Sequence, residues 1–370
     1  MPRPVFPTLV GKTTGKDAPI VTIQTDIPHA QPLVSSLLWR HRLLLSLVVI
    51  HLGLALSVSL HLRVPFESST LSTLITMLRV LVPVFVILLM FWRFGWMAIT
   101  VRPERPIQWF IADLRAILLD PDRMLGGILA FLAIALFAGT FAFLKDLIPL
   151  FSHFAWDPSF AVLDRALHGG HDPWTLLVPV FGSPLMTTAL NAAYHFWFFL
   201  LYFLVFMACF DARRPQLSMT FLITFVLAWA IAGNLVATLL ASAGPVYYQV
   251  MGFGDMFVPL LERLQEVSEV SPVWALNVHQ MLLDGYLAGE GMRGISAMPS
   301  MHVGSCVVMT IYCFNIRRWL GWMLLGFTVI IQIGSVHLAW HYAIDGYLSA
   351  GIALLCWPLA RRLVGRFAPA

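Results

Sequence analysis

The chain has 370 residues, of which 59% are hydrophobic and only 11% are charged. Because about a quarter of the residues in a soluble domain are charged, this composition excludes an ordinary soluble globular protein. The formal net charge of +4 is small and gives no reason to expect a nucleic-acid partner. All four cysteines fall inside apolar stretches, so we expect them to pack as small hydrophobic residues rather than to form disulfides.

The apolar residues form long blocks, each close to the roughly twenty residues that a helix needs to cross a bilayer. The first 36 residues are rich in Pro and Thr and contain neither an apolar stretch nor a signal-peptide pattern. We interpret 1–36 as a flexible cytoplasmic tail, 37–123 as two spans followed by an interfacial helix, and 124–363 as a six-helix catalytic core. The prediction is an all-α, polytopic membrane bundle with eight spans, at 43–61, 74–92, 124–144, 187–209, 217–241, 299–314, 319–338 and 343–360.

The charges on the connecting loops predict the orientation of these spans. If the N-terminus is cytoplasmic, eight spans place most acidic residues outside and twelve arginines inside, as the positive-inside rule requires. An odd number of spans would destroy this asymmetry, so we expect both termini in the cytoplasm. The arginine-rich, lysine-poor composition further suggests a bacterial inner membrane. The twelve arginines are Arg93, Arg102, Arg105, Arg115, Arg123, Arg213, Arg214, Arg317, Arg318, Arg361, Arg362 and Arg366.

Three connections are predicted to contain helices that do not cross the membrane. Residues 106–119 carry an apolar stripe at helical spacing. In 158–168, Asp157 is placed to cap the helix, Pro158 fits its first turn, and two glycines end it. The loop 243–297 holds a third stripe, for which a passive interfacial helix and a lid over a cleft both remain open. That stripe consists of Phe257, Leu260, Leu261, Leu264 and Val267.

Two short polar clusters near the C-terminus carry most of the chemical information. They are Pro299-Ser300-Met301-His302 and 337–345, which ends with His341-Tyr342-Ala343-Ile344-Asp345. Ionisable groups in a membrane protein are costly and usually face a functional interior. A histidine and an aspartate at i, i+4 share one helix face, so the Asp345 carboxylate can accept the His341 N–H and strengthen the other ring nitrogen as a base or nucleophile.

The predicted topology brings these clusters to the same outer membrane surface as the 242–248 loop. Pro299 suits the first turn of the sixth span, and Ser300 with the following amides would face outward from a helix N-terminus, which favours a phosphate. His302 lies on that first turn. We therefore predict covalent catalysis in which His341 is the nucleophile and His302 supplies a proton to the leaving oxygen.

These clusters resemble the second and third signature motifs of the type 2 phosphatidic acid phosphatase superfamily, P-S-G-H and S-R-x5-H-x3-D. The segments 295–302 and 341–345 look most like the branch that contains inositol phosphorylceramide synthase and its bacterial relatives. The resemblance covers roughly 124–360. It implies a metal-independent phosphohistidine enzyme without a cofactor, a lipid phosphate substrate among the membrane lipids, His341 as nucleophile, His302 as general acid, and Asp345 as the orienting carboxylate.

The resemblance also implies a phosphate-binding role for Ser300, but the chain departs from the family motifs elsewhere. Met301 stands where the broader family has glycine, and the third motif's arginine is missing. The first motif, K-x6-R-P, would fall at Gly244-Pro245, with no lysine upstream. The phosphate would therefore lack positive partners. Arg293 is the candidate replacement, because arginine forms paired hydrogen bonds with phosphate, although an ordinary loop arginine is the alternative.

Two further residues have both a functional and a structural interpretation. His337, one turn before His341, could join the site or form a hydrogen bond within the bundle. Tyr247 could bind a headgroup or belong to the interfacial aromatic belt.

The acceptor is open: water would make the protein a lipid phosphatase, and an alcohol such as inositol would make it a phosphotransferase. A metalloenzyme reading uses His337, His341 and Asp345 as ligands at i, i+4 and i+8. A transporter with intramembrane histidines is a third class.

Overall fold

The computed structural model describes residues 33–66, 74–289 and 294–367, and these residues contain helices and no strand. The all-helical prediction is therefore confirmed for this part of the chain. The longer helices are α1 Leu33–Leu62, α3 Val82–Trp96, α4 Pro106–Leu118, α5 Pro121–Asp146, α7 Asp157–Leu167, α8 Pro173–Phe181, α9 Pro184–Cys209, α10 Pro215–Ala228, α12 Val258–Val270, α13 Trp274–Ala288, α14 Met301–Ile316, α15 Arg318–His337 and α16 Ala343–Phe367. Shorter elements are α6 Ile148–Phe151, α11 Ala237–Leu239, the π-helical stretches η1 Met77–Leu81, η2 Met97–Val101 and η3 Trp229–Val236, and the 3-10 turn η4 Pro245–Tyr247.

Seven helices in the described residues are long and apolar enough to cross a membrane, so the chain is an integral membrane protein. Each corresponds to one of the eight predicted spans. The remaining predicted span, the sixth in chain order, is α14, a shorter apolar helix of 16 residues. The predicted positions were right within a few residues at most ends, although α1 begins at Leu33, inside the segment predicted to be a tail, and α3 forms one continuous span over Leu74–Val101. The rest of the predicted tail lies outside the described residues.

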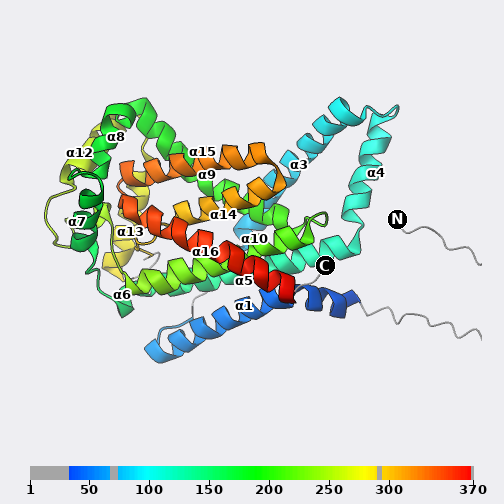
Figure 1. Cartoon of the computed structure of the whole chain (residues 1–370), viewed down its shortest axis with the longest axis horizontal. Coiled ribbons are helices and arrows are strands. Elements are labelled where there is room, and N and C mark those ends of the chain that lie inside the picture. The colour runs from blue at the N-terminus through cyan, green and yellow to red at the C-terminus, as the bar shows by residue number, and fades with distance from the viewer. Residues whose placement is uncertain (1–32, 67–73, 290–293, 368–370) are drawn as a thin grey trace, which may run out of the picture.

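The spans lie side by side, and all the described helices that do not cross, except α4, gather at one end of the bundle (Figure 1). At that end α5 and α15 stop, α9, α14 and α16 start, and α6, α7, α8, α12 and α13 pack over them. At the opposite end α4 lies across the bundle axis. A cavity of about 410 Å³ opens there, and its lining includes Arg40, Asp122 and Arg123.

The two N-terminal spans attach to the other helices in different ways. Along α1, the buried His51 ring joins α5 and η3, because its two nitrogens lie 2.8 Å from the Thr140 hydroxyl and 3.1 Å from the Asn234 amide oxygen. Such pairing is expected where buried polar groups meet inside a bilayer. The attachment of α3 is apolar, through Phe85, whose ring lies 5.2–5.7 Å from Phe199, Phe203 and Phe206 of α9.

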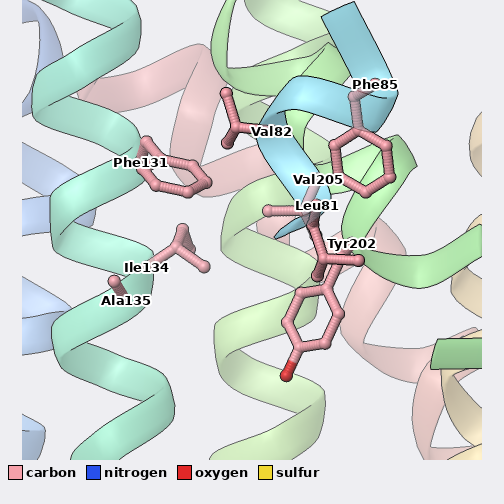
Figure 2. Close-up of a pocket in the computed structure, with 8 residues that line it drawn as sticks. All are labelled: Leu81, Val82, Phe85, Phe131, Ile134, Ala135, Tyr202 and Val205. Carbon is pink, nitrogen blue, oxygen red and sulfur yellow. The ribbon is translucent and has the colours of Figure 1, made fainter. Parts of the chain in front are cut away.

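Figure 2 shows the small gap that remains where α3 meets α5 and α9. Its volume is about 10 Å³, which is at most enough for one water, and its lining side chains are apolar apart from the Tyr202 hydroxyl. The gap is therefore a packing feature of the membrane interior rather than a ligand site. Its lining residues are Leu81, Val82, Phe85, Phe131, Ile134, Ala135, Tyr202 and Val205.

The three predicted non-crossing helices are present as α4, α7 and α12. On α12, four of the five stripe residues are buried and the fifth, Leu261, is partly buried. The capping role predicted for Asp157 was wrong. Trp156 is the N-cap of α7 and Asp157 is its first residue, because the Asp157 carboxylate is drawn to amides of a distant loop described below.

The order of the helices predicts which exposed positions can be labelled chemically from the same side of the membrane. We expect single cysteines introduced at His171 and Ser268 to react with a membrane-impermeant maleimide from one side, and those at Ala212 and Asn315 only from the other. All four positions are exposed, and the two pairs lie at opposite ends of the bundle. Labelling of intact and permeabilised cells, in a variant without the four native cysteines, measures this. Reaction of His171→Cys and Ala212→Cys from the same side would contradict the helix order.

Candidate active site

Three loops meet at the end of the bundle where the short helices gather, and backbone hydrogen bonds join them. The Ala297 amide donates to the Ser242 carbonyl at 2.9 Å, and the Val246 amide donates to the Ala339 carbonyl at 3.0 Å. The Ser300 amide donates to the Asp345 carbonyl, also at 3.0 Å. The loops 242–246, 296–300 and 338–345 therefore form one hydrogen-bonded platform. All three predicted polar clusters belong to it.

Gly244 lies at the centre of this platform and is required there on two grounds. Its φ of +93° is a conformation that residues with a Cβ rarely adopt. A Cβ at this position would also lie 2.8 Å from the Trp340 carbonyl oxygen and 2.9 Å from Ala297 Cβ. Gly244 therefore lets two loops approach each other. Its own amide is bound within the protein rather than facing a ligand.

The partner of that amide is Asp157, a fully buried carboxylate on α7. Its two oxygens accept hydrogen bonds from the Ala243 and Gly244 amides, both at 2.8 Å. The Tyr342 hydroxyl also donates to it, at 2.9 Å. Burial raises the pKa of Asp157, while the hydrogen bonds from the two amides act in the opposite direction. One side chain thus binds the 242–246 loop and the 338–345 loop together.

A second buried aspartate on α7, Asp164, holds the start of α16. Its carboxylate accepts hydrogen bonds from the Ala343 amide at 2.9 Å and from the Ile344 amide at 3.2 Å. These are orphan amides of the first helical turn, which a helix cannot satisfy by itself. Burial raises the pKa of Asp164, and the hydrogen bond from Ala343 opposes that change. The first turn of α16, which carries Asp345, is positioned by this contact.

His341 and Asp345 are in contact, but they do not share a helix as the i, i+4 spacing predicted. The helix begins only at Ala343, so His341 lies in the loop that precedes it. The contact forms because one Asp345 oxygen faces back over the helix start. It accepts a hydrogen bond from His341 Nδ1 at 3.1 Å and from the Tyr342 amide at 3.1 Å. The proton of the neutral His341 ring is therefore on Nδ1, where it is donated to Asp345. The other ring nitrogen, Nε2, keeps a free lone pair.

The second predicted histidine, His302, lies beside the first. The ring centroids of His302 and His341 are 6.3 Å apart, and the rings are inclined by 61°. His302 is held by aromatic contacts with α9, because its ring lies 4.2 Å from the Tyr194 ring and 4.0 Å from the Trp197 ring. One imidazole on α14 and one in the loop before α16 are therefore within reach of one small ligand.

Burial and a nearby charge keep His341 unprotonated. Desolvation is the larger cause and the positive charge of Lys145 the smaller, and together they lower the pKa of His341 to about 3. The Ala297 carbonyl next to the imidazole acts in the opposite direction. A neutral imidazole is the form that can act as a nucleophile.

Ser300 lies within the platform, but its predicted orientation was wrong. The helix begins at Met301, so Ser300 is the N-cap and Pro299 precedes the helix instead of joining its first turn. The Ser300 side chain is fully buried, and its hydroxyl accepts from the Val303 amide at 3.5 Å. Its own amide donates to Asp345 and does not face outward.

The other residues predicted for phosphate binding have partners within the protein or lie outside the described residues. Tyr247 is buried, and its hydroxyl donates to the His279 carbonyl at 3.0 Å. His337 is buried at the end of α15, where Nε2 lies 2.9 Å from the Thr187 hydroxyl. Arg293 lies outside the described residues.

The hypothesis of a metal site loses its geometric basis. His337 ends α15, His341 lies in the loop, and Asp345 belongs to α16, so the three share no helix. Within the ranges that the structure describes, no three His, Cys, Asp or Glu side chains are grouped as a metal would require. The i, i+4, i+8 spacing therefore does not correspond to a ligand set in this fold.

Asp157 and Asp164 were not identified as site residues from the sequence. A signal was nevertheless present, because residues seven apart lie on the same side of a helix. Both aspartates fall on the face of α7 that also buries Phe160 and Ala161. An acid on the apolar face of an amphipathic helix has to find a buried partner, and here each carboxylate is paired with backbone amides.

A scan of protein-family models matches residues 158–359 to a family described as the PAP2 superfamily. The match covers more than half of the chain, from α7 to most of α16, and includes the whole platform. Neither the curated proteins nor the solved structures gave a match to this chain.

The two backbone contacts of Asp157 predict a specific loss of stability. In Asp157→Asn one of the Ala243 and Gly244 amides would face an NH₂ group, and an unsatisfied buried donor costs about 1–3 kcal/mol. We therefore expect a clear fall in the midpoint of thermal unfolding in detergent. Asp172→Asn is the matched control, since the Asp172 carboxylate binds the partly exposed Arg165 side chain, which water can solvate, and not buried backbone amides. Equal midpoints for the two variants would show that Asp157 does not secure the loops.

Proposed function

This chain belongs to the PAP2 superfamily, and we propose that it transfers the phosphoryl group of a lipid phosphate through a phosphohistidine intermediate. Membership of this superfamily implies phosphatase or phosphotransferase activity on lipid phosphates in general. The observation that carries the proposal is the pair of imidazoles 6.3 Å apart, one of which donates from Nδ1 to a buried carboxylate.

In the first step, the lone pair of His341 Nε2 attacks phosphorus. A nitrogen–phosphorus bond forms and the bond from phosphorus to the lipid oxygen breaks. His302 gives a proton to that leaving oxygen, so the lipid departs as an alcohol. The separation of the two rings supports this division of roles, since a nucleophile about 3–3.5 Å from phosphorus and an acid about 3 Å from the leaving oxygen fit on either side of one phosphoryl group.

Asp345 serves the same step without touching the phosphate. As the nitrogen–phosphorus bond forms, the imidazole ring becomes positively charged. The Asp345 carboxylate on Nδ1 stabilises that charge and keeps the ring in the tautomer that presents Nε2. Because Asp345 has no exposed surface, this interaction is not weakened by water.

In the second step, an acceptor oxygen attacks the phosphohistidine, the nitrogen–phosphorus bond breaks, and His302 takes the acceptor's proton. Water as the acceptor releases inorganic phosphate. An alcohol gives a new phosphate ester. The likeness of 295–302 and 341–345 to the inositol phosphorylceramide synthase branch supports an alcohol as the acceptor. Attack by inositol on the phosphohistidine would release inositol phosphate. If the group on His341 is instead an inositol phosphate headgroup, attack by a lipid alcohol would transfer that headgroup, which is the second candidate activity.

We further propose that the site faces the periplasm of a bacterial inner membrane. The platform lies at one end of the bundle, and the connections at the other end carry most of the arginines. By the positive-inside rule this arginine-rich end is cytoplasmic. A site at the opposite end meets lipids of the outer leaflet.

The nucleophile is tested by removing it. We expect His341→Ala to lower turnover of a lipid phosphate by at least about a thousandfold and to abolish labelling of the protein by a radioactive phosphate substrate. His302→Ala is expected to lower turnover by about 10²–10⁴-fold, the usual contribution of a general acid, and still to accept label slowly. His171→Ala, an exposed histidine on the same face, is the control. A His341→Ala protein with normal turnover would refute the proposal.

The identity of the acceptor is tested by the products. We incubate purified protein with phosphatidic acid and with a phosphoinositol lipid, each with and without an added alcohol acceptor. Release of inorganic phosphate that is insensitive to the alcohol identifies a phosphatase. Inositol phosphate formed from phosphatidic acid only when inositol is added identifies a phosphotransferase, and a new lipid phosphodiester formed from the phosphoinositol lipid only when a lipid alcohol is added identifies a headgroup transferase. Movement of unchanged lipid between vesicles, with neither product, would favour the transporter class instead.

A further inference from the structure

The region around the two imidazoles contains three buried carboxyl groups and little to neutralise an anion. These are Asp157, Asp164 and Asp345, each of them buried. A phosphate monoester brings about 1.5–2 further negative charges near neutral pH. A phosphoryl group held between the imidazoles therefore requires a positive partner close by.

Among the lysines and arginines that the structure describes, Lys145 forms a hydrogen bond to a platform loop. It is in the last turn of α5, and its Nζ lies 3.5 Å from the Ser296 carbonyl oxygen. The aliphatic part of the Lys145 side chain passes close to Gly294, two residues before that loop. A Cβ at Gly294 would lie 3.9 Å from both Cγ and Cε of Lys145. The ammonium is thereby directed at the 296–300 segment of the platform, although α5 contributes no predicted motif.

The position of this ammonium connects it with both histidines. The Ala297 carbonyl, one residue after the Lys145 contact, faces the His341 ring. The charge of Lys145 acts on His341 and also on His302. Of the lysines and arginines in the part of the chain that the structure describes, Lys145 is the one whose charge acts on both rings.

The hydrogen bonding of Lys145 leaves room for a ligand. An ammonium has three N–H donors. One of them makes a long hydrogen bond, to Ser296, and the neighbouring Asp146 attracts the charge. Lys145 is only partly exposed, so water does not fully solvate the remaining donors. A doubly charged oxyanion is a far better acceptor than a single carbonyl oxygen.

We propose that the Lys145 ammonium binds a non-bridging oxygen of the phosphoryl group held between His302 and His341. The inference rests on the proposed function and names a residue that it leaves unassigned. Lysine acts on phosphate as a point charge and needs no paired geometry, so approach from one helix end is sufficient. Its charge would neutralise part of the phosphate and, as the complex forms, favour attack by the uncharged His341.

The first test compares variants of the lysine. Orthovanadate is the probe, because it mimics phosphate. We expect Lys145→Met to raise the inhibition constant of vanadate and the KM for a lipid phosphate by about 10–100-fold, the value of one charge-assisted hydrogen bond, and Lys145→Arg to recover most of the loss. Arg63→Met, which removes an exposed cation from the outer end of α1, is the matched control. Vanadate binding by Lys145→Met that equals the wild type would overturn the inference.

The pH profile supplies a readout that a purely structural lysine would not change. His341 is in contact with Asp345, His302 and the Ala297 carbonyl, besides the charge of Lys145. Removing that positive charge raises the pKa of His341. The rate of phosphoenzyme formation falls at low pH as His341 becomes protonated. This acid limb of the pH–rate profile should therefore move to higher pH in Lys145→Met and stay in place in Lys145→Arg. An unmoved limb in both variants counts against the inference.

The second test uses the unmodified protein and is independent of how the variants fold. The chain has only three lysines, Lys12, Lys16 and Lys145. We expect vanadate to slow modification of Lys145 by an amine-reactive reagent several-fold, as measured by mass spectrometry, and to leave Lys12 and Lys16 unaffected. If vanadate slowed the modification of none of the three lysines, or of all three equally, the inference would be contradicted. If His341→Ala retains turnover, the proposed function fails; if only the Lys145 tests fail, the proposed function stands and the lysine has no part in it.

Discussion

The site depends on one constraint: backbone amides buried at the junction of three loops must have acceptors. Asp157 and Asp164 supply them, with four hydrogen bonds of 2.8–3.2 Å to amides of the 242–246 loop and of the α16 start. Leaving one such amide unpaired costs about as much as a large single mutation. The loops are therefore held wherever α7 places its two carboxylates. The approach of His302 to His341 follows from that arrangement, since one histidine begins α14 and the other precedes α16.

The order and length of the spans could be predicted from the sequence because a bilayer imposes both. A stretch of about twenty apolar residues has few alternatives to a helix when no water is present to bind its backbone. The contact between His341 and Asp345 was also predicted, although the shared helix behind the prediction does not exist. His341 lies two residues before α16 and Asp345 lies in its first turn, and this arrangement also brings the two side chains into contact.

What the sequence could not show are the contacts between segments far apart in the chain. The carboxylate of Asp157 meets amides 86 and 87 residues away, and no spacing rule indicates that distance. The same is true of Lys145, 151 residues before its partner Ser296. Ser300 was misplaced for a related reason: its amide had an obvious local role at a helix start, but the Asp345 carbonyl competes for it.

Hydrogen bonds attach the short helices to the platform and to the spans. Tyr247, directly after the 242–246 loop, donates its hydroxyl to a carbonyl of α13, and the Asn191 side chain of α9 accepts from the Ala275 amide at the start of the same helix. Swinging this layer away would break both buried bonds and expose the apolar face of α12. The layer of short helices is therefore held over the platform by buried hydrogen bonds. A lipid phosphate that binds at the platform would accordingly approach laterally, between the spans, with its acyl chains still in the membrane.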